Sequence, residues 1–357
     1  MTTVARFEIS FVQVLNEAGE LVAPLPACVE NPETLQSLYR LMLEARIFDR
    51  KAIALQRTGK MGTYAPINGQ EAISTAIGHA MRAEDVLVPY YRDYPAQFQR
   101  GVRMAEIFAF WGGDERGSEY ANCPEDLPIC VPIASQCLHA TGIAFAFQYR
   151  KQPRVAVACI GEGGTSEGDF YEAINVAGAW NLPVVFVVNN NQWAISVPRD
   201  KQTRTQTIAQ KAIAGGFEGI QVDGNDIIAM REVLERALEK ARNGGGPTLI
   251  EAITWRLCDH TTADDATRYQ PSPDVDAARP KEPLIRLRRY LESRGLWDAA
   301  REAEAEALSS AKVEAAVTEY LERAPQPVSS IFDHHYATLP DYLVEQRAIA
   351  MEEASHA

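Results

Sequence analysis

The chain has 357 residues, of which 46% are hydrophobic and 23% charged, and its formal net charge at pH 7 is −13. This length allows one large or two modest domains, and the acidic balance argues against nucleic acid or an anionic membrane as partner, because phosphate affinity comes from Lys and Arg. No apolar run approaches the roughly 18–20 residues of a membrane span, and the start MTTVARFEIS lacks a signal-peptide pattern. Six cysteines without a CxxC pair favour reduced thiols. We therefore expect a cytoplasmic protein.

The first elements in chain order are an arm and two helices. Residues 1–31 are expected to form an N-terminal arm with a short strand over 11–15. A helix from residue 32 is predicted by apolar residues that recur at helical spacing: Leu35, Leu38, Met42, Ala45 and Phe48. A glycine-containing loop then leads to a second helix over 70–81.

Residues 85–260 predict strands and helices in alternation. The candidate strands are VLVPYY, PICVPIA, RVAVACI, PVVFVV, GIQV and TLIEAIT, and the helices between them include 136–150, 167–181 and 226–243. Near-continuous apolar strands in such an alternation predict an α/β fold with a mostly parallel sheet and helices on both faces. A polar loop follows over 259–276, and then two helices over 281–323. We expect three parts, namely the arm 1–31, an α/β domain over 32–275 and a helical region over 276–357.

The segment VAVACIGEGGTSEG, residues 155–168, runs from an apolar strand into a glycine-rich loop typical of phosphate binding. A dinucleotide fingerprint is excluded, because Ser166 stands where the third glycine is needed and the strand PVVFVV ends in three asparagines instead of an acid. A P-loop is excluded as well, because no lysine follows Gly168.

The loop is better explained by a metal. Glu162 follows the strand VAVACI and Asn191 follows PVVFVV, 29 residues later, which is one strand–helix–strand step. The carboxyl ends of such strands lie side by side, so both side chains reach one edge of the sheet. A carboxylate and an amide oxygen with open positions suit Mg²⁺ bound to a diphosphate, which the glycines allow to approach the backbone closely.

This pattern resembles the thiamine diphosphate motif, in which GDG or GEG is followed by a helix and then by NN. Over roughly residues 10–345 the chain is similar to the alpha subunits of the decarboxylating component of 2-oxo acid dehydrogenase complexes. The segments that carry the resemblance are GEGGTSEGDFYEAINVAGAWNLPVVFVVNNNQWAIS, NGQEA, YYRDYP, VPIASQ, IQVDGNDI, GPTLIEAITWR and DHTTADDATRY. The segments VQVLNEAGE and RRYLESRGLW are most similar to the bacterial pyruvate dehydrogenase branch of that family.

The resemblance implies a thiamine diphosphate-binding fold and a role for each matching residue. The implied metal ligands are Glu162, Asn191 and the backbone carbonyl of Trp193. The implied diphosphate contacts are Gly161, Gly163, Gly164, Tyr91 and Arg92, of which the guanidinium is well suited to a diphosphate.

Three further residues match positions around the reacting end of the cofactor. Ile133 matches an apolar contact near the aminopyrimidine ring. His260 matches the active-site histidine, which can donate to the diphosphate and exchange a proton near neutral pH, and Arg256 is expected to support it. Asp169 and Glu172 are open to two interpretations: acids in the first turn of a helix complement its dipole, and in relatives acids here line a polar tunnel between two active sites. Both interpretations can hold.

The activity that the resemblance implies is oxidative decarboxylation of a 2-oxo acid with transfer of the acyl group to a lipoyl group. The implied partners are the lipoyl domain and core of the dihydrolipoamide acyltransferase, and a beta subunit that supplies the second half of the cofactor site. We expect two alpha and two beta chains and an alpha chain that is inactive alone.

Several alternatives stay open. Branched-chain 2-oxo acid dehydrogenase and acetoin dehydrogenase alpha subunits share the motifs, and relatives often carry a histidine in the segment 112–130, where this chain has none. An NAD-dependent oxidoreductase would need an acid where the asparagine run stands. A non-catalytic assembly subunit would not need Glu162, Asn191, Arg92 and His260 together.

Overall fold

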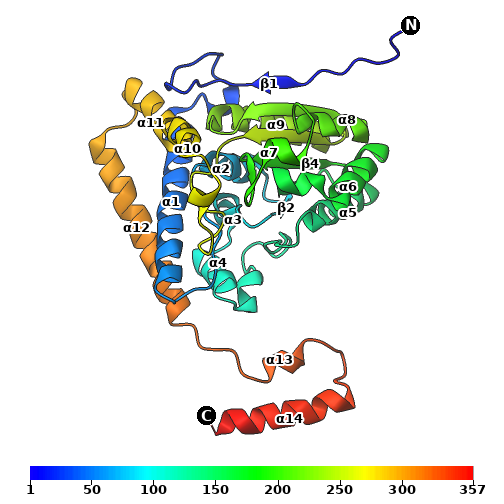
Figure 1. Ribbon diagram of the computed structural model, residues 1–357, viewed down its shortest axis with the longest axis vertical. Coiled ribbons are helices and arrows are strands. Elements are labelled where there is room, and N and C mark those ends of the chain that lie inside the picture. The colour runs from blue at the N-terminus through cyan, green and yellow to red at the C-terminus, as the bar shows by residue number, and fades with distance from the viewer. Residues whose placement is uncertain (357) are drawn as a thin grey trace.

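The computed structural model describes residues 1–356, which form a parallel β-sheet between layers of helices (Figure 1). The six strands of the sheet are β1 (Ser10–Val12), β2 (Val86–Val88), β3 (Ala156–Gly161), β4 (Val184–Asn190), β7 (Glu218–Asp223) and β8 (Thr248–Ile253). Their order is β1-β7-β8-β4-β3-β2, and every neighbouring pair is parallel. A small hairpin, β5 (Trp193–Ala194) with β6 (Val197–Pro198), follows β4. The predicted α/β fold is confirmed.

Fourteen α-helices are present within residues 1–356. Their bounds are α1 (Pro32–Arg57), α2 (Glu71–Ala80), α3 (Tyr94–Arg100), α4 (Met104–Trp111), α5 (Ser135–Tyr149), α6 (Gly168–Ala179), α7 (Arg199–Gln202), α8 (Ala212–Gly215), α9 (Ile227–Arg242), α10 (Ser272–Ala278), α11 (Pro283–Ser293), α12 (Ala299–Leu321), α13 (Ser330–Asp333) and α14 (Asp341–Ser355). Across this part of the chain, every helix is too short or too polar to cross a bilayer.

Alternate residues of the central strands supply two separate hydrophobic cores, as the period of a strand requires. Val157 and Val185 join the core that α1, α2 and α9 cover. Ala158 and Phe186 join the core under α5 and α6. Strands covered on both faces carry side chains that are apolar throughout. The segments VAVACI and PVVFVV could therefore be predicted as strands from the sequence.

One predicted strand is wrong. The segment PICVPIA, residues 128–134, contributes to the sheet only an isolated bridge between Cys130 and Tyr90. Pro128 and Pro132 lack the backbone N–H that a ladder needs, and Ala134 turns the chain with φ of 69°. The apolar character of this segment serves instead to line a cavity beside α5.

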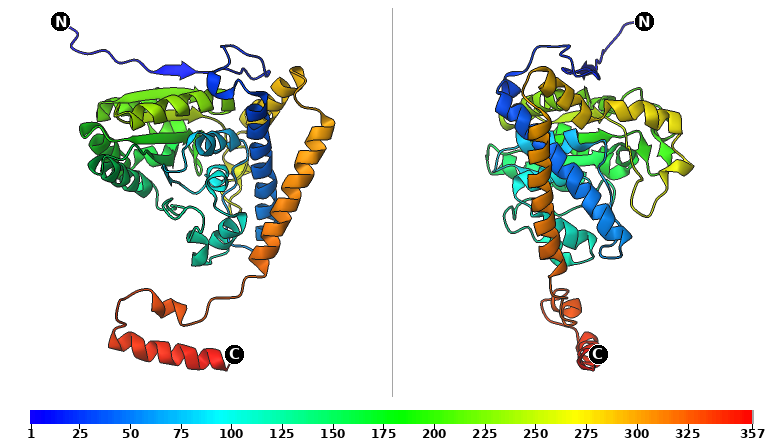
Figure 2. Two further views of the ribbon diagram at one scale, coloured as in Figure 1. Left: turned by 180° about the vertical axis from the view of Figure 1, so that it is seen from behind. Right: turned by 90° about the vertical axis from the view of Figure 1, so that its left-hand side faces the viewer.

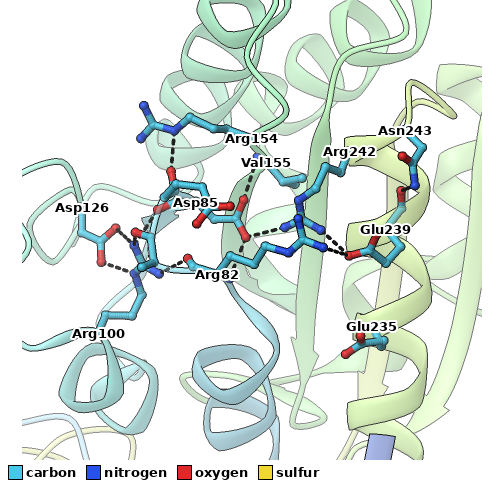
Figure 3. Close-up of polar contacts among 12 residues, drawn as sticks. Arg82, Asp85, Arg100, Asp126, Arg154, Val155, Glu235, Glu239, Arg242 and Asn243 are labelled. Carbon is cyan, nitrogen blue, oxygen red and sulfur yellow. Dashed lines mark hydrogen bonds and ion pairs between the residues drawn. The ribbon is translucent and has the colours of Figure 1, made fainter. Parts of the chain in front are cut away.

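The amino-terminal edge of the sheet holds buried charges in ion pairs (Figure 3). The Asp85 carboxylate, which precedes β2, accepts from Val155 N at 3.0 Å and pairs with Arg242 Nη2 at 2.7 Å. Asp126 pairs with Arg100 and accepts from Leu87 N at 2.8 Å. The first pair joins the starts of β2 and β3 to the end of α9, and the second joins β2 to the end of α3.

The two ends of the chain leave the body differently. The N-terminal arm returns to the sheet through β1, and Asp226 at the start of α9 accepts from the backbone N–H of Val14 at 2.7 Å and of Leu15 at 2.6 Å. The C-terminal segment 325–356 projects away from the body and ends in α14 (Figures 1 and 2). No residue of α13 or α14 is buried. The domain boundaries at 31/32 and 275/276 stay a prediction.

Candidate functional site

The predicted site lies at the carboxyl edge of the sheet, where β3 and β4 end level with each other. Gly161 of β3 pairs with Asn189 of β4, so Glu162 and Asn191 leave the sheet side by side, and Asn191 N lies 3.3 Å from Glu162 Oε2. A cavity of about 230 Å³ opens there. The predicted residues that line it are Tyr91, Arg92, Ile133, Gly161, Glu162, Gly163, Gly164, Asn191, Trp193 and His260.

The Glu162 carboxylate is buried without a full set of partners. It is 3% exposed, and its Oε1 atom accepts no hydrogen bond. Burial raises the pKa of this carboxyl to about 7. A buried, incompletely solvated carboxylate costs free energy unless a cation or donor satisfies it, so this oxygen fits a bound metal ion.

The other two predicted metal ligands lie on the turn that follows β4. Asn191 donates from Nδ2 to Gln70 Oε1 at 2.9 Å, and its Oδ1 accepts from Trp193 N at 3.2 Å. These two bonds fix the orientation of the amide and leave one lone pair of Oδ1 for a ligand. The Trp193 carbonyl is 3.5 Å from Arg256 Nη1. Within residues 1–356 no group of three or more His, Cys, Asp or Glu side chains is placed to hold a metal. The candidate set is therefore one carboxylate, one amide and one carbonyl, which are hard oxygen ligands of the kind that Mg²⁺ accepts.

Gly163 and Gly164 are required by packing as well as by any ligand. A Cβ atom on Gly163 would lie 2.5 Å from Ala194 Cβ, and one on Gly164 would lie 2.8 Å from the Ile160 side chain. The loop Glu162–Ser166, a 3₁₀ turn labelled η3, is thereby held close to the β5 hairpin and to the end of β3. Side chains at these positions would push the backbone out of the cavity wall.

Two buried arginines make this end of the site positive: Arg92 lines the cavity, whereas Arg256 lies behind the lining residues Trp193 and His260. Arg92 is 3% exposed and donates to the carbonyls of Pro66 and, at 2.7 Å, of His260. Arg256 donates to the Ile195 carbonyl at 2.8 Å and to the Tyr269 hydroxyl at 2.6 Å. Neither guanidinium has a carboxylate among these partners, so their charges are not neutralised and favour an anion.

His260 is held in one tautomer by these arginines. Its Nδ1 atom lies 3.0 Å from Arg92 Nη2 and 3.4 Å from Arg256 Nη1. Guanidinium groups only donate, so Nδ1 accepts and Nε2 carries the proton. Burial and the two positive charges lower the pKa of His260 to about 3. The imidazole of the protein without ligand is therefore neutral at pH 7, which differs from the expected titration near neutrality, because the sequence did not show that two arginines meet at this ring.

Asp169 and Glu172 do not line the cavity. Asp169 lies in the first turn of α6 and is half-buried, whereas Glu172, which was also expected in the first turn, lies just beyond it and is exposed. Their roles stay predictions, and the placement suits the helix dipole as well as a surface shared with another chain.

Sequence reasoning missed several residues of the site. Gln70 orients Asn191, and Tyr90 accepts from Asn189 Nδ2 at 2.7 Å through its hydroxyl. Glu167 and Ile195 line the cavity. Gln70 and Tyr90 stand inside the motifs NGQEA and YYRDYP, which gave a signal, whereas the position of Ile195 depends on the hairpin after β4.

Comparison with known proteins gives a consistent result. The dehydrogenase E1 component family matches residues 39–329. The pyruvate dehydrogenase E1 component subunit alpha of Staphylococcus aureus is 40% identical over 354 residues, which cover 99% of this chain and 95% of the relative. The protein of the same name from Staphylococcus epidermidis shows the same identity and coverage.

Proposed function

The chain belongs to the dehydrogenase E1 component family, and from that premise we propose that it is the alpha subunit of a pyruvate dehydrogenase that uses thiamine diphosphate and Mg²⁺. The observation that carries the proposal is the buried Glu162 carboxylate with an unpartnered oxygen, beside two arginines without carboxylate partners. A metal ion would supply the positive charge that Glu162 lacks, and a diphosphate would supply the negative charge that the two arginines lack.

The residues divide the cofactor between them. Glu162, Asn191 and the Trp193 carbonyl would hold Mg²⁺ through oxygen atoms. Arg92 would donate to the diphosphate as a fixed fork of N–H groups, with Gly163 and Gly164 forming the wall beside it. When bound, thiamine diphosphate supplies the electron sink for loss of CO₂ from a 2-oxo acid.

His260 acts as a hydrogen-bond donor at this site. Because its Nδ1 atom accepts from Arg92 and Arg256, Nε2–H is the free donor and its direction is fixed. A bound diphosphate would offset the two guanidinium charges and raise the pKa of the imidazole from its low value in the free protein. With the diphosphate bound, His260 would be able to take up and release a proton.

A beta subunit is proposed to complete the site. Ile133 and Ile195 line the cavity, and they are 48% and 54% exposed. Apolar side chains at the rim of a polar site are stabilised when another chain covers them. The proposed acceptor of the acyl group is the lipoyl group of an acyltransferase core. The proposed location of the protein is the cytoplasm.

A branched-chain 2-oxo acid is the second candidate substrate. The segment 112–130 lacks the histidine that relatives often carry, so either another group takes its place or the substrate pocket differs from theirs. One methylene changes discrimination by only about 1–3 kcal/mol, so a small difference in the pocket is sufficient to exchange the two substrates.

The test is decarboxylation measured with an artificial electron acceptor, for the chain alone and for the chain co-expressed with its beta partner. With thiamine diphosphate and Mg²⁺ added, we expect turnover only with the partner and mainly on pyruvate. A preference for 3-methyl-2-oxobutanoate would retain the mechanism and replace the substrate. Equal turnover by the chain alone would contradict the shared site.

A further inference from the structure

Lys211 is a buried lysine close to the cofactor loop, outside the cavity lining. It ends the short turn η4 (Ala209–Lys211), is 4% exposed, and donates from Nζ to the Thr165 carbonyl at 2.6 Å and to Thr165 Oγ1 at 2.9 Å. Nζ also lies 5.2 Å from the centre of the Tyr171 ring. Lysine is almost never buried unless it is paired, and here its hydrogen-bond partners are neutral.

Thr165 connects Lys211 to Glu162, the proposed metal ligand at the start of the loop. Thr165 belongs to η3, and its Oγ1 atom donates to the Glu162 carbonyl at 2.6 Å. Lys211 therefore holds the end of the turn whose beginning carries Glu162. Its contact is made from behind, because neither Lys211 nor Thr165 lines the cavity.

A second buried charge, Glu251, connects η4, the turn that ends at Lys211, to the end of β4, the strand that precedes Asn191. The Glu251 carboxylate on β8 accepts from Ala209 N in η4 at 3.0 Å and from Asn190 Nδ2 at 2.7 Å. Asn190 directly precedes the predicted ligand Asn191. One carboxylate thus fixes both the turn that carries Lys211 and the end of the strand that carries Asn191.

We propose that Lys211 is a positioning residue for the cofactor site. It holds η3 in place, so that Glu162 and the glycines of the loop lie beside Asn191. The burial of Lys211, its two bonds to Thr165 and the anchoring of its turn by Glu251 carry the inference. It rests on the proposed function, because the loop is the proposed metal and diphosphate site.

Lys211→Met tests the inference, and Lys240→Met is its matched control. Lys240 Nζ also donates to a carbonyl, that of Pro247 at 3.1 Å, and to a threonine hydroxyl, Thr248 Oγ1 at 3.1 Å, but at the amino end of β8. It differs from Lys211 in being partly exposed and in pairing with Glu218 Oε2 at 2.9 Å. Two quantities are measured on the full chain with its partner. They are hydrogen exchange of the backbone amides of 162–167 without cofactor, and the dissociation constant of thiamine diphosphate in the presence of Mg²⁺.

We expect Lys211→Met to speed exchange in 162–167 and to weaken cofactor binding about 10- to 100-fold, as changes behind a metal ligand do. Lys211→Arg, which keeps a cationic donor, should retain more affinity, and Lys240→Met should change neither quantity. Unchanged exchange and affinity in Lys211→Met would overturn the inference alone. If the unmodified protein binds no cofactor, the proposed function fails, and the exchange data still decide whether Lys211 holds the loop. If Lys211→Met does not fold, Thr165→Val replaces it, with the same two outcomes.

Discussion

The two edges of the β-sheet differ in whether their buried charged side chains have partners of opposite charge. At the amino edge, Asp85 and Asp126 are each paired with an arginine and accept backbone N–H groups (Figure 3). At the carboxyl edge, Glu162 keeps an oxygen without a partner, and Arg92 donates to carbonyls. Both edges are buried to a similar degree, so the difference lies in pairing.

This contrast separates a structural role from a functional one. A buried charge that has its counter-charge fixes the elements that the pair joins, and it needs no ligand to neutralise it. A buried charge without a counter-charge costs stability in the free protein and lowers the cost of binding the ion that neutralises it. The charged residues at the carboxyl edge are therefore expected to lower the stability of the free protein and to raise its affinity for a ligand. Those at the amino edge are expected to contribute to stability alone.

The largest effect is expected from Glu162→Gln. Turnover should fall by more than about 100-fold, because changes behind a metal ligand already cost about 10- to 100-fold. The thermal midpoint of the cofactor-free protein should stay the same or rise, because an unsatisfied carboxylate is removed. Turnover and melting are measured on the same preparation, and a large loss of stability in this variant would place Glu162 with the structural charges.

Asp85→Asn should give the opposite pattern. Removing one partner of a buried ion pair takes from Arg242 its buried counter-charge and leaves it only the partly exposed Glu239, so we expect the free energy of unfolding to fall by up to about 3–5 kcal/mol. Denaturant unfolding measures it. Thiamine diphosphate affinity of the folded protein should be unchanged, and a weakened cofactor affinity at equal folded fraction would break the separation between the two edges.

His260 offers a finer comparison within the carboxyl edge. Its pKa in the cofactor-free protein should lie well below the ordinary value of 6.5, near 3, and should rise when thiamine diphosphate binds. NMR titration of the ring measures both values. Because the folded-state pKa is the lower one, the unfolded chain binds the proton more readily, so this contribution to stability is present above pH 6.5 and is lost as the pH falls toward 3. A pKa near 6.5 without cofactor would contradict the arrangement with the two arginines.

Removal of residues 330–357 should have the smallest effect on the isolated chain. No residue of α13 or α14 is buried, so the unfolding free energy should change by less than about 0.5 kcal/mol, as for surface changes in general. A larger loss would show that this segment packs on the body. Equal stability together with weaker association with the beta partner would give the exposed Tyr342, Val344 and Ile349 a docking role.

The sequence predicted the parts of the fold that repeat a simple pattern. The apolar runs before Gly161 and Asn189 identified two strands, and the topology of a strand–helix–strand step brought Glu162 beside Asn191. The prediction failed at residues 128–134, because a run of apolar residues with two prolines can line a cavity as well as form a strand. Within the predicted helical region 276–357, the bounds of α14 were not predicted, because none of its residues is buried and its apolar residues give no clear period.

The details of the site depended on contacts between distant segments. Arg92 and Arg256 stand 164 residues apart, and only the folded chain shows that both reach Nδ1 of His260 and lower its pKa. The same holds for Lys211 and Thr165, which share no motif. The proposed metal ligands next to the strand ends could be predicted from the sequence, whereas the residues behind them could be found only from the packing.

The most direct test of the account is binding of thiamine diphosphate to the co-expressed complex, measured by calorimetry with and without Mg²⁺ for the unmodified protein and for Glu162→Gln. We predict tight binding that requires Mg²⁺ and is lost in Glu162→Gln. Binding of equal strength without Mg²⁺, or unchanged binding in Glu162→Gln, would contradict the assignment of the carboxyl edge as a metal diphosphate site.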